Sequence, residues 1–301
     1  MLKGPAGEMT CAHDLRIRVM RPDEIALAAD WAAAEGWNPG LADAACFATV
    51  DPGGFLIGEL DGAPAATISC VNYDERFAFL GFYIVRGDLR GRGYGLRIWN
   101  AAIAHARGRT IGLDGVVAQQ GNYRKSGFQL AYANIRYGGT VAPRPAPPGG
   151  IVPLADVPFA TVTADDATVF PAPRAPFLRA WISARQHVGR ALVRDGRLAA
   201  WGVIRPCRTG RKIGPLVADD RAAAEATFAA LVAAEGPGEV FLDVPSVNRA
   251  MRSRSRRTTA LRQCLRPRAC IPGRSAPSVS SACSASPPSS WDDAHAGEGR
   301  G

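Results

Sequence analysis

The sequence predicts a mixed α/β protein in which one arrangement of strands and helices occurs twice. Residues 14–138 alternate strand-like and helix-like segments, and residues 151–250 repeat much the same order. Between them, residues 139–150 ("GTVAPRPAPPGG") are rich in proline and glycine, which is typical of an extended linker. These observations divide the chain into two similar domains, followed from residue 251 by a tail of different composition.

The first domain contains two segments with a clear pattern. Residues 77–85 ("FAFLGFYIV") are almost all apolar, as expected of a central strand that is covered on both faces. Leu96, Trp99 and Ile103 recur at helical spacing, which predicts an amphipathic helix over 96–106. The remaining strands are expected at 16–20, 55–60, 65–73 and 110–117, with a helix at 22–36 and a short helix and last strand within 121–139.

The second domain repeats this order in a weaker form. "APFLRAWISAR" (175–185) predicts a helix, and residues 189–205 predict a hairpin turned at "DG". "KIGPLVADDRAAAEATFAALVAAEG" (212–236) predicts a strand, a turn and a helix, and "EVFLDV" (239–244) predicts a buried strand. We therefore interpret residues 151–250 as a degenerate copy of the first domain.

The tail, residues 251–301, has no apolar period and is rich in Arg, Ser, Pro and Cys. Such a composition cannot bury enough apolar surface to offset the entropy of ordering, so we expect the tail to be disordered. A frameshifted C-terminus would explain this composition. The second domain would then lack a closing helix and strand and would keep an exposed sheet edge. A natural tail on a complete domain is the alternative.

The net charge of +9 does not indicate a nucleic-acid-binding surface. Nine arginines and three acidic residues fall within 251–301, so this segment carries six of the nine net positive charges. The rest of the chain is nearly balanced, and nucleic acid is an unlikely partner.

Composition also indicates where the protein acts. The apolar runs are too short to span a bilayer, and no secretory signal opens the chain, so we expect no membrane partner. Seven scattered cysteines without CxxC spacing indicate reduced thiols in the cytoplasm. His13, His105 and His187 are isolated, and no metal site is expected.

The turn between the predicted central strand and the next helix is unusual. Gly91, Gly93 and Gly95 alternate with Arg90, Arg92 and Tyr94, and small residues allow successive backbone N–H groups to converge on an anion. The two arginines can add charge-assisted hydrogen bonds. A Rossmann fingerprint and a P-loop both fail on spacing, so the turn predicts a diphosphate site of another kind.

The segment Arg90 to Gly95 resembles the R/Q-x-x-G-x-G/A motif of the GNAT acetyltransferases, in which this turn holds the pyrophosphate of acetyl-CoA. Residues 123–128 (Tyr-Arg-Lys-Ser-Gly-Phe) are similar to the Y-x-K-x-G-F segment of the same family. The resemblance covers 14–138 in the right order and implies a GNAT fold with a central, largely antiparallel sheet and flanking helices. The second domain lacks the turn and resembles the cradle-less half of two-domain GNAT proteins.

The resemblance also implies site residues and an activity. Phe82, Tyr83, Ile84 and Val85 would lie along the pantetheine arm, and Tyr123 would protonate the leaving thiolate or pack beside the cofactor. The family often has an asparagine where Val116 stands, which leaves that polar contact to Gln119, Gln120 or Asn122. The implied activity is N-acetyl transfer from acetyl-CoA to an amine within a ternary complex.

The sequence does not single out the general base or the amine acceptor of this reaction. Glu59, Asp74, Glu75 and Asp114 are candidates for the general base, and Trp37 for contact with a small-molecule amine, its alternative being a core-capping tryptophan. A CoA-binding regulatory module without catalysis and a protein N-acetyltransferase are alternative functions. Homodimer formation also stays open.

Overall fold

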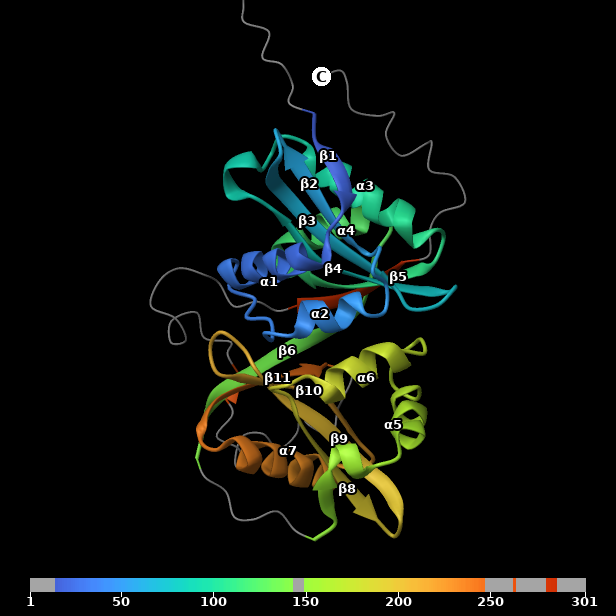
Figure 1. The fold of residues 1–301 in the computed structure, drawn as a ribbon, viewed down its shortest axis with the longest axis vertical. Coiled ribbons are helices and arrows are strands. Elements are labelled where there is room, and N and C mark those ends of the chain that lie inside the picture. Colours follow the sequence, from blue (N-terminus) through green and yellow to red (C-terminus); the bar gives the residue numbers. More distant parts are fainter. Residues whose placement is uncertain (1–13, 143–148, 247–261, 264–279, 286–301) are drawn as a thin grey trace, which may run out of the picture.

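The computed structural model describes residues 14–142, 149–246, 262–263 and 280–285. Within them, one continuous sheet runs through both domains in the order β1-β2-β3-β4-β5-β13-β6-β11-β10-β9-β8-β7. The β4–β5 and β10–β11 pairs are parallel, and the other pairs along this path are antiparallel. The predicted mixed α/β fold with a largely antiparallel, duplicated sheet is therefore confirmed (Figure 1).

The first domain places its sheet between two layers of helices. Its elements are β1 (Arg16–Val19), α1 (Ile25–Ala34), α2 (Asp43–Ala48), β2 (Phe55–Leu60), β3 (Ala63–Asn72), β4 (Phe77–Val85), α3 (Tyr94–Ala106), β5 (Thr110–Val116), α4 (Gln120–Lys125) and β6 (Gln129–Val141). Leu56 packs in the cluster of α3, whereas its neighbours Phe55 and Ile57 pack in the cluster of α1 and α2. Successive strand residues point to opposite faces, so both faces of β2 are buried.

Strands β4 and β5 separate part-way along their length. They pair only from Phe77 to Leu80 on β4 and from Thr110 to Leu113 on β5. Beyond Leu80, β4 stays paired with β3, with a register shift between Thr67 and Ser69. The edge of Gly81–Val85 that faces β5 is consequently left without a strand, as expected for the segment Phe82–Val85.

The second domain repeats the arrangement of the first. Its elements are β7 (Ile151–Pro153), α5 (Phe159–Asp166), α6 (Ala175–Ser183), β8 (Val188–Arg194), β9 (Arg197–Pro206), β10 (Arg211–Ala218), α7 (Arg221–Glu235) and β11 (Gly238–Pro245). Val203 packs in the cluster with α6, and Ile204 packs on the opposite face in the cluster with α7. Helices α2 and α5 carry only six and eight residues, and neither was predicted from the sequence.

Strand β6 belongs to both domains. Its residues from Asn134 to Val141 pair with all of β11 from the second domain. The exposed sheet edge predicted for the second domain is therefore wrong, because the first domain supplies the missing strand. The predicted linker is also shorter than expected: residues 139–141 form the end of β6, and 143–148 lie outside the described residues.

The tail is described at two short strands. β12 (Arg262–Gln263) pairs with β6, and β13 (Ser280–Ala285) lies between β5 and β6 and pairs with both. At these positions the tail adds two short strands to the sheet of the first domain. The rest of the predicted disordered tail lies outside the described residues, and the frameshift stays a prediction.

Buried contacts join the two domains beside the sheet. Arg205 of β9 donates two hydrogen bonds to Asp43 of α2, at 2.7 and 3.1 Å, and both side chains are 9% exposed. Nearby, the rings of Phe47 on α2 and Phe177 on α6 stack at 5.1 Å. These contacts of α2 with β9 and α6 hold the two domains together.

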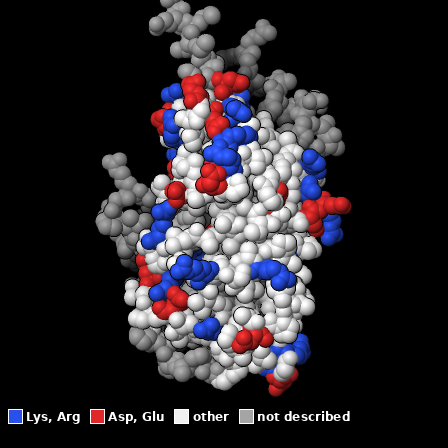
Figure 2. Space-filling view, viewed as in Figure 1, with Lys and Arg blue, Asp and Glu red and all other residues white. Residues whose placement is uncertain are grey.

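The surface charges and the helix lengths bear on the partners expected from the composition. On the face shown in Figure 2, side chains of both signs are interspersed over the described residues. Within the same residues, no helix is long and apolar enough to cross a membrane.

Candidate active site

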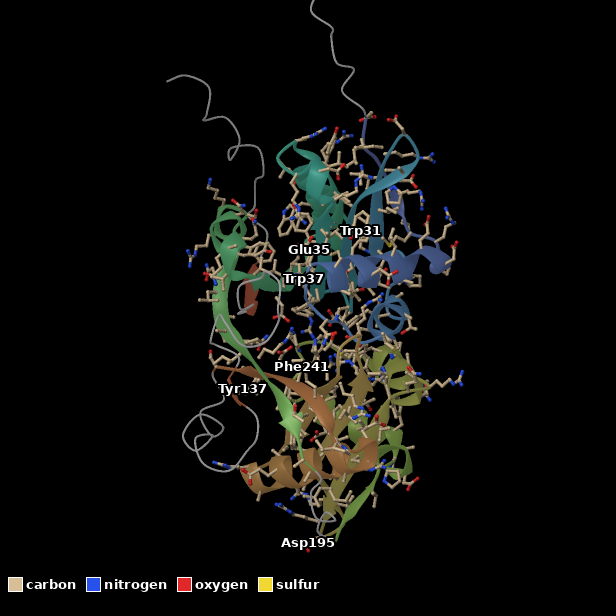
Figure 3. The ribbon with its side chains drawn as sticks, turned by 90° about the vertical axis from the view of Figure 1, so that its left-hand side faces the viewer. Trp31, Glu35, Trp37, Tyr137, Asp195 and Phe241 are labelled. Carbon is tan, nitrogen blue, oxygen red and sulfur yellow. The ribbon has the colours of Figure 1, made fainter. Side chains whose placement is uncertain are left out.

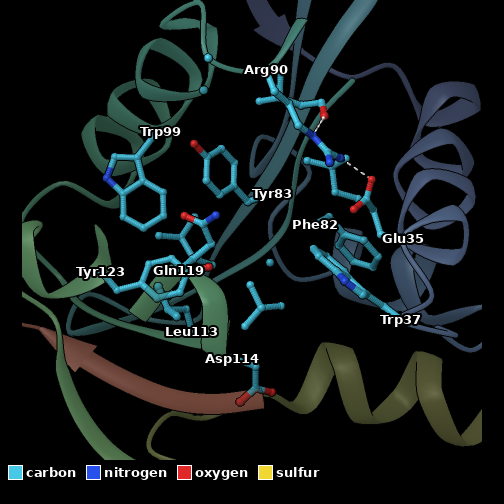
Figure 4. A pocket seen from close by; sticks show the side chains of 17 residues that line it. Glu35, Trp37, Phe82, Tyr83, Arg90, Trp99, Leu113, Asp114, Gln119 and Tyr123 are labelled. Atoms are coloured by element: carbon cyan, nitrogen blue, oxygen red, sulfur yellow. Dashed lines mark hydrogen bonds and ion pairs between the residues drawn. The ribbon is translucent and has the colours of Figure 1, made fainter. Parts of the chain in front are cut away.

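The separation of β4 from β5 opens a cavity of about 370 Å³ in the first domain. The free edge of β4 forms one wall, and Arg90, Gly91 and Gly95 of the glycine-rich turn line it as well. Trp99 of α3 and Tyr123 of α4 close the side opposite Glu35 and Trp37 (Figure 4). Among the described residues, no strand pairs with Gly81–Val85 on the side of β5, so backbone groups there are available to a ligand.

The glycine-rich turn has the backbone conformation of an anion cradle. Gly91 and Gly93 adopt left-handed φ values of +77° and +81°, which favour glycine, and Gly93 is the N-cap of α3. A Cβ added at either residue would meet no atom within 4 Å, so the space above the turn is open. The first N–H groups of a helix lack intrahelical partners and carry the positive end of its dipole. The turn can therefore hold a phosphate.

The side chains of this turn have different roles. Arg90 is held at the rim of the cavity, because its Nε donates to the carbonyl of Val85 at 2.9 Å and its guanidinium pairs with Glu35. Arg92 is exposed and able to reach a ligand outside the cavity. Tyr94 packs instead in the core beside Leu15, Ala65 and Leu89, so its side chain anchors the start of α3.

The predicted pantetheine-binding strand is locally distorted. Phe82 has a φ of +48°, which is rare for an aromatic residue, and its carbonyl accepts a hydrogen bond from Thr67 Oγ1 at 2.9 Å. Tyr83 reaches α3, and a Cβ at Gly95 would lie 2.6 Å from its hydroxyl. Burial raises the pKa of Tyr83, which keeps that hydroxyl protonated. A larger residue at position 95 would therefore displace the Tyr83 hydroxyl.

Tyr123 lies in an aromatic wall of the cavity. Its ring stacks on Trp99 at 6.0 Å and meets Phe128 edge-on at 6.4 Å. Gly115 of β5 lies directly under the ring, because a Cβ there would be 2.4 Å from Tyr123 Cε2. The Tyr123 ring is therefore held in place by Trp99, Phe128 and Gly115.

Asp114 lies at the base of the cavity, close to the second domain (Figure 4). Its Oδ1 accepts a hydrogen bond from Asn134 Nδ2 at 2.9 Å. Solvent reaches the carboxylate, yet protein surrounds it on most sides, and this desolvation raises the pKa of Asp114. The hydrogen bond from Asn134 opposes the rise, and the charge of Asp243 reinforces it. A carboxylate with a raised pKa is suited to accept a proton near neutral pH.

The other candidate bases from the sequence do not line this cavity. Glu59 is paired with Arg18, whose hydrogen bonds lower its pKa. Asp74 caps a turn by accepting from the backbone N–H groups of Arg76 and Phe77, and Glu75 is exposed beside it. Asp114 is the member of the four that the structure brings into the cavity.

The predicted histidines and cysteines form no further site. His105 bonds to Asp51 at 2.7 Å, and His187 Nδ1 lies 2.8 Å from the carbonyl of Trp181. Cys46, Cys70 and Cys207 are buried free thiols. Among the residues that the structure describes, no group of three His, Cys, Asp or Glu side chains is placed to hold a metal ion.

Comparison with known proteins agrees with this geometry. Sequence models of the acetyltransferase (GNAT) family and of an acetyltransferase (GNAT) domain match residues 23–128 and 162–277. The chain is 33% identical over 228 residues to the holothin acyltransferase of Pseudoalteromonas sp. (strain SANK 73390), covering 75% of this chain and 77% of that protein. The chain belongs to the GNAT family, with two GNAT domains. The second match in this GNAT protein extends past residue 251 into the tail.

Solved structures show the same fold. A proposed acetyltransferase of Pyrococcus horikoshii superposes on this GNAT protein with a TM-score of 0.69 at 20% identity, over 94% of this chain and 92% of that one. A tandem GNAT protein from the clavulanic acid biosynthesis pathway superposes with a TM-score of 0.57 at 17% identity, over 79% and 92%. At these identities the likeness concerns the fold alone.

Sequence reasoning missed parts of the site that are formed by distant contacts. Glu35 and Trp99 line the cavity but were predicted as helix residues without a role at the site. Trp99 belongs to the apolar pattern of Leu96 and Ile103 at helical spacing. That pattern does not distinguish a core residue from one that lines a cavity. Val116 and Gln119 also line the cavity. The side chain of Gln119 is held by Asn122, whose Nδ2 donates to Gln119 Oε1 at 2.7 Å.

Proposed function

We propose that this protein transfers the acyl group of acetyl-CoA to a primary amine by direct attack within a ternary complex. The observation that carries the proposal is the continuity of one cavity: it joins the glycine-rich turn to the free edge of β4, Tyr123 and Asp114. A diphosphate held at the turn can extend its arm along Gly81–Val85 and bring a thioester to the polar end. The family supports acyl transfer, and acetyl as the acyl group is part of the proposal.

The donor would be held mainly by backbone groups. N–H groups at Gly91–Gly95 would bind the pyrophosphate, with Arg92 adding a charge from outside. N–H groups near Phe82 and Tyr83 would polarise the thioester carbonyl, as donors do in an oxyanion hole. Binding through the backbone would account for the glycines of the turn and for the absence of a strand beside Gly81–Val85 on the side of β5 among the described residues.

The transfer requires one base and one acid. The amine nitrogen attacks the thioester carbon, so that a C–N bond forms and the C–S bond breaks. Asp114 would take the proton from the amine, directly or through water, and Tyr123 would supply a proton to the departing thiolate. Asp114 faces the second domain, which would therefore form one wall of the acceptor site.

The acceptor is proposed to be a small molecule. A cavity of about 370 Å³ between Trp37 and Trp99 suits a compact amine better than a polypeptide. The related protein named a holothin acyltransferase supports this class of substrate. A catalytically silent CoA-binding module and a protein N-acetyltransferase are the outcomes that the test below would reveal.

The test combines binding with turnover. Calorimetry with CoA should detect binding to the wild type and none to Gly93→Val, whose side chain would enter the open space above the turn. Gly108→Val is the matched control, because Gly108 has a φ of +82° and open surroundings at the far end of α3, so it carries equal backbone strain. Equal CoA affinity in wild type and Gly93→Val would contradict the assigned cradle.

Turnover is measured as free thiol and as the mass of the acylated amine, over a panel of small amines and acyl-CoA chain lengths. Asp114→Asn should lower kcat/KM at neutral pH and regain rate as rising pH deprotonates the amine in solution. Glu75→Gln, an exposed carboxylate outside the cavity, should match the wild type. CoA binding without transfer to any amine would indicate a regulatory module, and transfer only to peptides would indicate a protein acetyltransferase.

A further inference from the structure

The second domain contains a buried cation with no partner. Lys212 of β10 is only 7% exposed. Its ammonium makes no hydrogen bond or ion pair with any residue in the described ranges, although charged side chains surround it. Burying an unpaired charge is costly unless something pairs with it. An acceptor atom supplied by a ligand would offset this cost.

The charges around Lys212 are already paired with one another. Arg136 of β6 forms two hydrogen bonds with Asp243 of β11, at 2.7 and 2.8 Å. Arg205 forms the bidentate pair with Asp43 described above. Among the described residues of this cluster, the ammonium of Lys212 and the carboxylate of Asp114 are left without an ion pair.

The register of the sheet places Lys212 on the same face as the paired charges around it. Lys212 pairs with Arg205 on β9 and with Phe241 on β11, so these side chains share one face. In Figure 3, Phe241 lies at the top of the second domain below Trp37 of the first. Arg136 donates to the carbonyl of Trp37 at 3.1 Å, which links this face to the wall of the cavity.

Asp114 and Lys212 are also close enough to influence each other. Asp114 bonds to Asn134, which lies two residues from Arg136 on the same face of β6. The positive charges of Arg136 and Lys212 both act to lower the pKa of Asp114. Side-chain contacts along β6 therefore link Asp114, at the base of the cavity, to the polar face of the second domain.

We propose that Lys212 binds an oxygen of the acceptor, a carboxylate or a carbonyl, while Asp114 receives its amine. This rests on the proposed function and narrows the acceptor to amines that carry such an oxygen. The first domain would supply the acyl donor and the base, and the second domain would select the substrate. The degenerate second domain then has a role although it lacks the cradle.

The ionisation of Lys212 gives this site a pH signature. Burial lowers the pKa of Lys212 to about 8, and the other charged or titratable groups that face it are Arg136, Asp243, Arg205 and Cys207. The positive charge of Lys212 acts in turn to lower the pKa values of Asp43 and Asp114. Because the ammonium is the binding form, the KM for an oxygen-bearing amine should rise as pH increases through that value.

The experiment compares matched acceptors on the full-length protein with acetyl-CoA. Glycine, β-alanine and γ-aminobutyrate are paired with methylamine, ethylamine and propylamine, and the corresponding amino amides test a carbonyl in place of a carboxylate. Lys212→Met should reduce kcat/KM about tenfold to a hundredfold for oxygen-bearing amines, the range of a lost charge-assisted hydrogen bond, and leave the plain amines unchanged. Arg197→Met removes a charge from the exposed start of β9 and should change neither class.

Each outcome bears on one proposal. An equal effect of Lys212→Met on both classes, or none on either, would overturn the role of Lys212 while leaving acyl transfer intact. No transfer to any amine by the wild type would instead overturn the proposed function. Thermal unfolding separates loss of fold from loss of binding, and Lys212→Arg, which keeps the charge, should retain the oxygen preference and lose the rise in KM above pH 8.

Discussion

The ion pair between Asp43 and Arg205 offers a quantitative test of how the domains are held together. Asp43→Asn removes the negative charge and leaves the Arg205 guanidinium buried without a counter-ion. Both side chains are 9% exposed, and the Asp43 carboxylate also accepts a hydrogen bond from the Gly40 N–H at 2.9 Å. Breaking a buried pair in this way costs about 3–5 kcal/mol of unfolding free energy.

The expected loss is large enough to measure by calorimetry or urea denaturation. At about 2–4 °C per kcal/mol for a chain of this size, the unfolding midpoint should fall by roughly 6–20 °C. Burial acts to raise the pKa of Asp43, but the charge and hydrogen bonds of Arg205 outweigh it, so this pKa lies below its ordinary value. The stabilisation is present above the unfolded pKa and is lost as pH falls through the folded one, so wild type and variant should converge in acid.

The control is a second ion pair that also joins the domains. Asp30 and Arg208 are paired but 55% and 52% exposed, and exposed pairs contribute about 1 kcal/mol or less. Asp30→Asn should therefore barely shift the midpoint. The double variant Asp43→Leu with Arg205→Met removes both charges and should recover much of the loss. If Asp43→Asn costs no more than Asp30→Asn, the buried pair does not secure the interface.

Three further predictions concern the catalytic wall and the tail. Tyr123→Phe should lower kcat about tenfold or more with little change in the KM for acetyl-CoA, and an unaltered kcat would reduce Tyr123 to a packing role. Gly115→Ala should displace the Tyr123 ring and reproduce that loss while CoA binding by calorimetry is retained; full activity would show that the ring position is unimportant. A chain ending at residue 250 should unfold at lower temperature than one ending at 285, because only the longer chain keeps β13 between β5 and β6, and equal midpoints would contradict this role of the tail.

Local sequence was sufficient to predict the elements whose structure depends on a single short segment. The strand at 77–85 matches β4 residue for residue, because an apolar run between turn signals is buried wherever it lies. The left-handed glycines at Gly91 and Gly93 were similarly predictable, since alternate glycines before a helix have few other uses. The helix after them begins at Tyr94, two residues earlier than the spacing of Leu96 suggested.

The sequence by itself determined most of the longer elements, the two GNAT domains and the left-handed glycine turn, because these depend on periodicity and on backbone freedom within short windows. Only the tertiary structure decided which domain each edge strand completes: β6 closes the second domain by pairing with β11 at long range. It also linked Asp114 to Asn134 of β6 and placed Lys212 beside the Arg136–Asp243 pair, since burial and strand register are properties of the assembled sheet and leave no periodic trace in the chain.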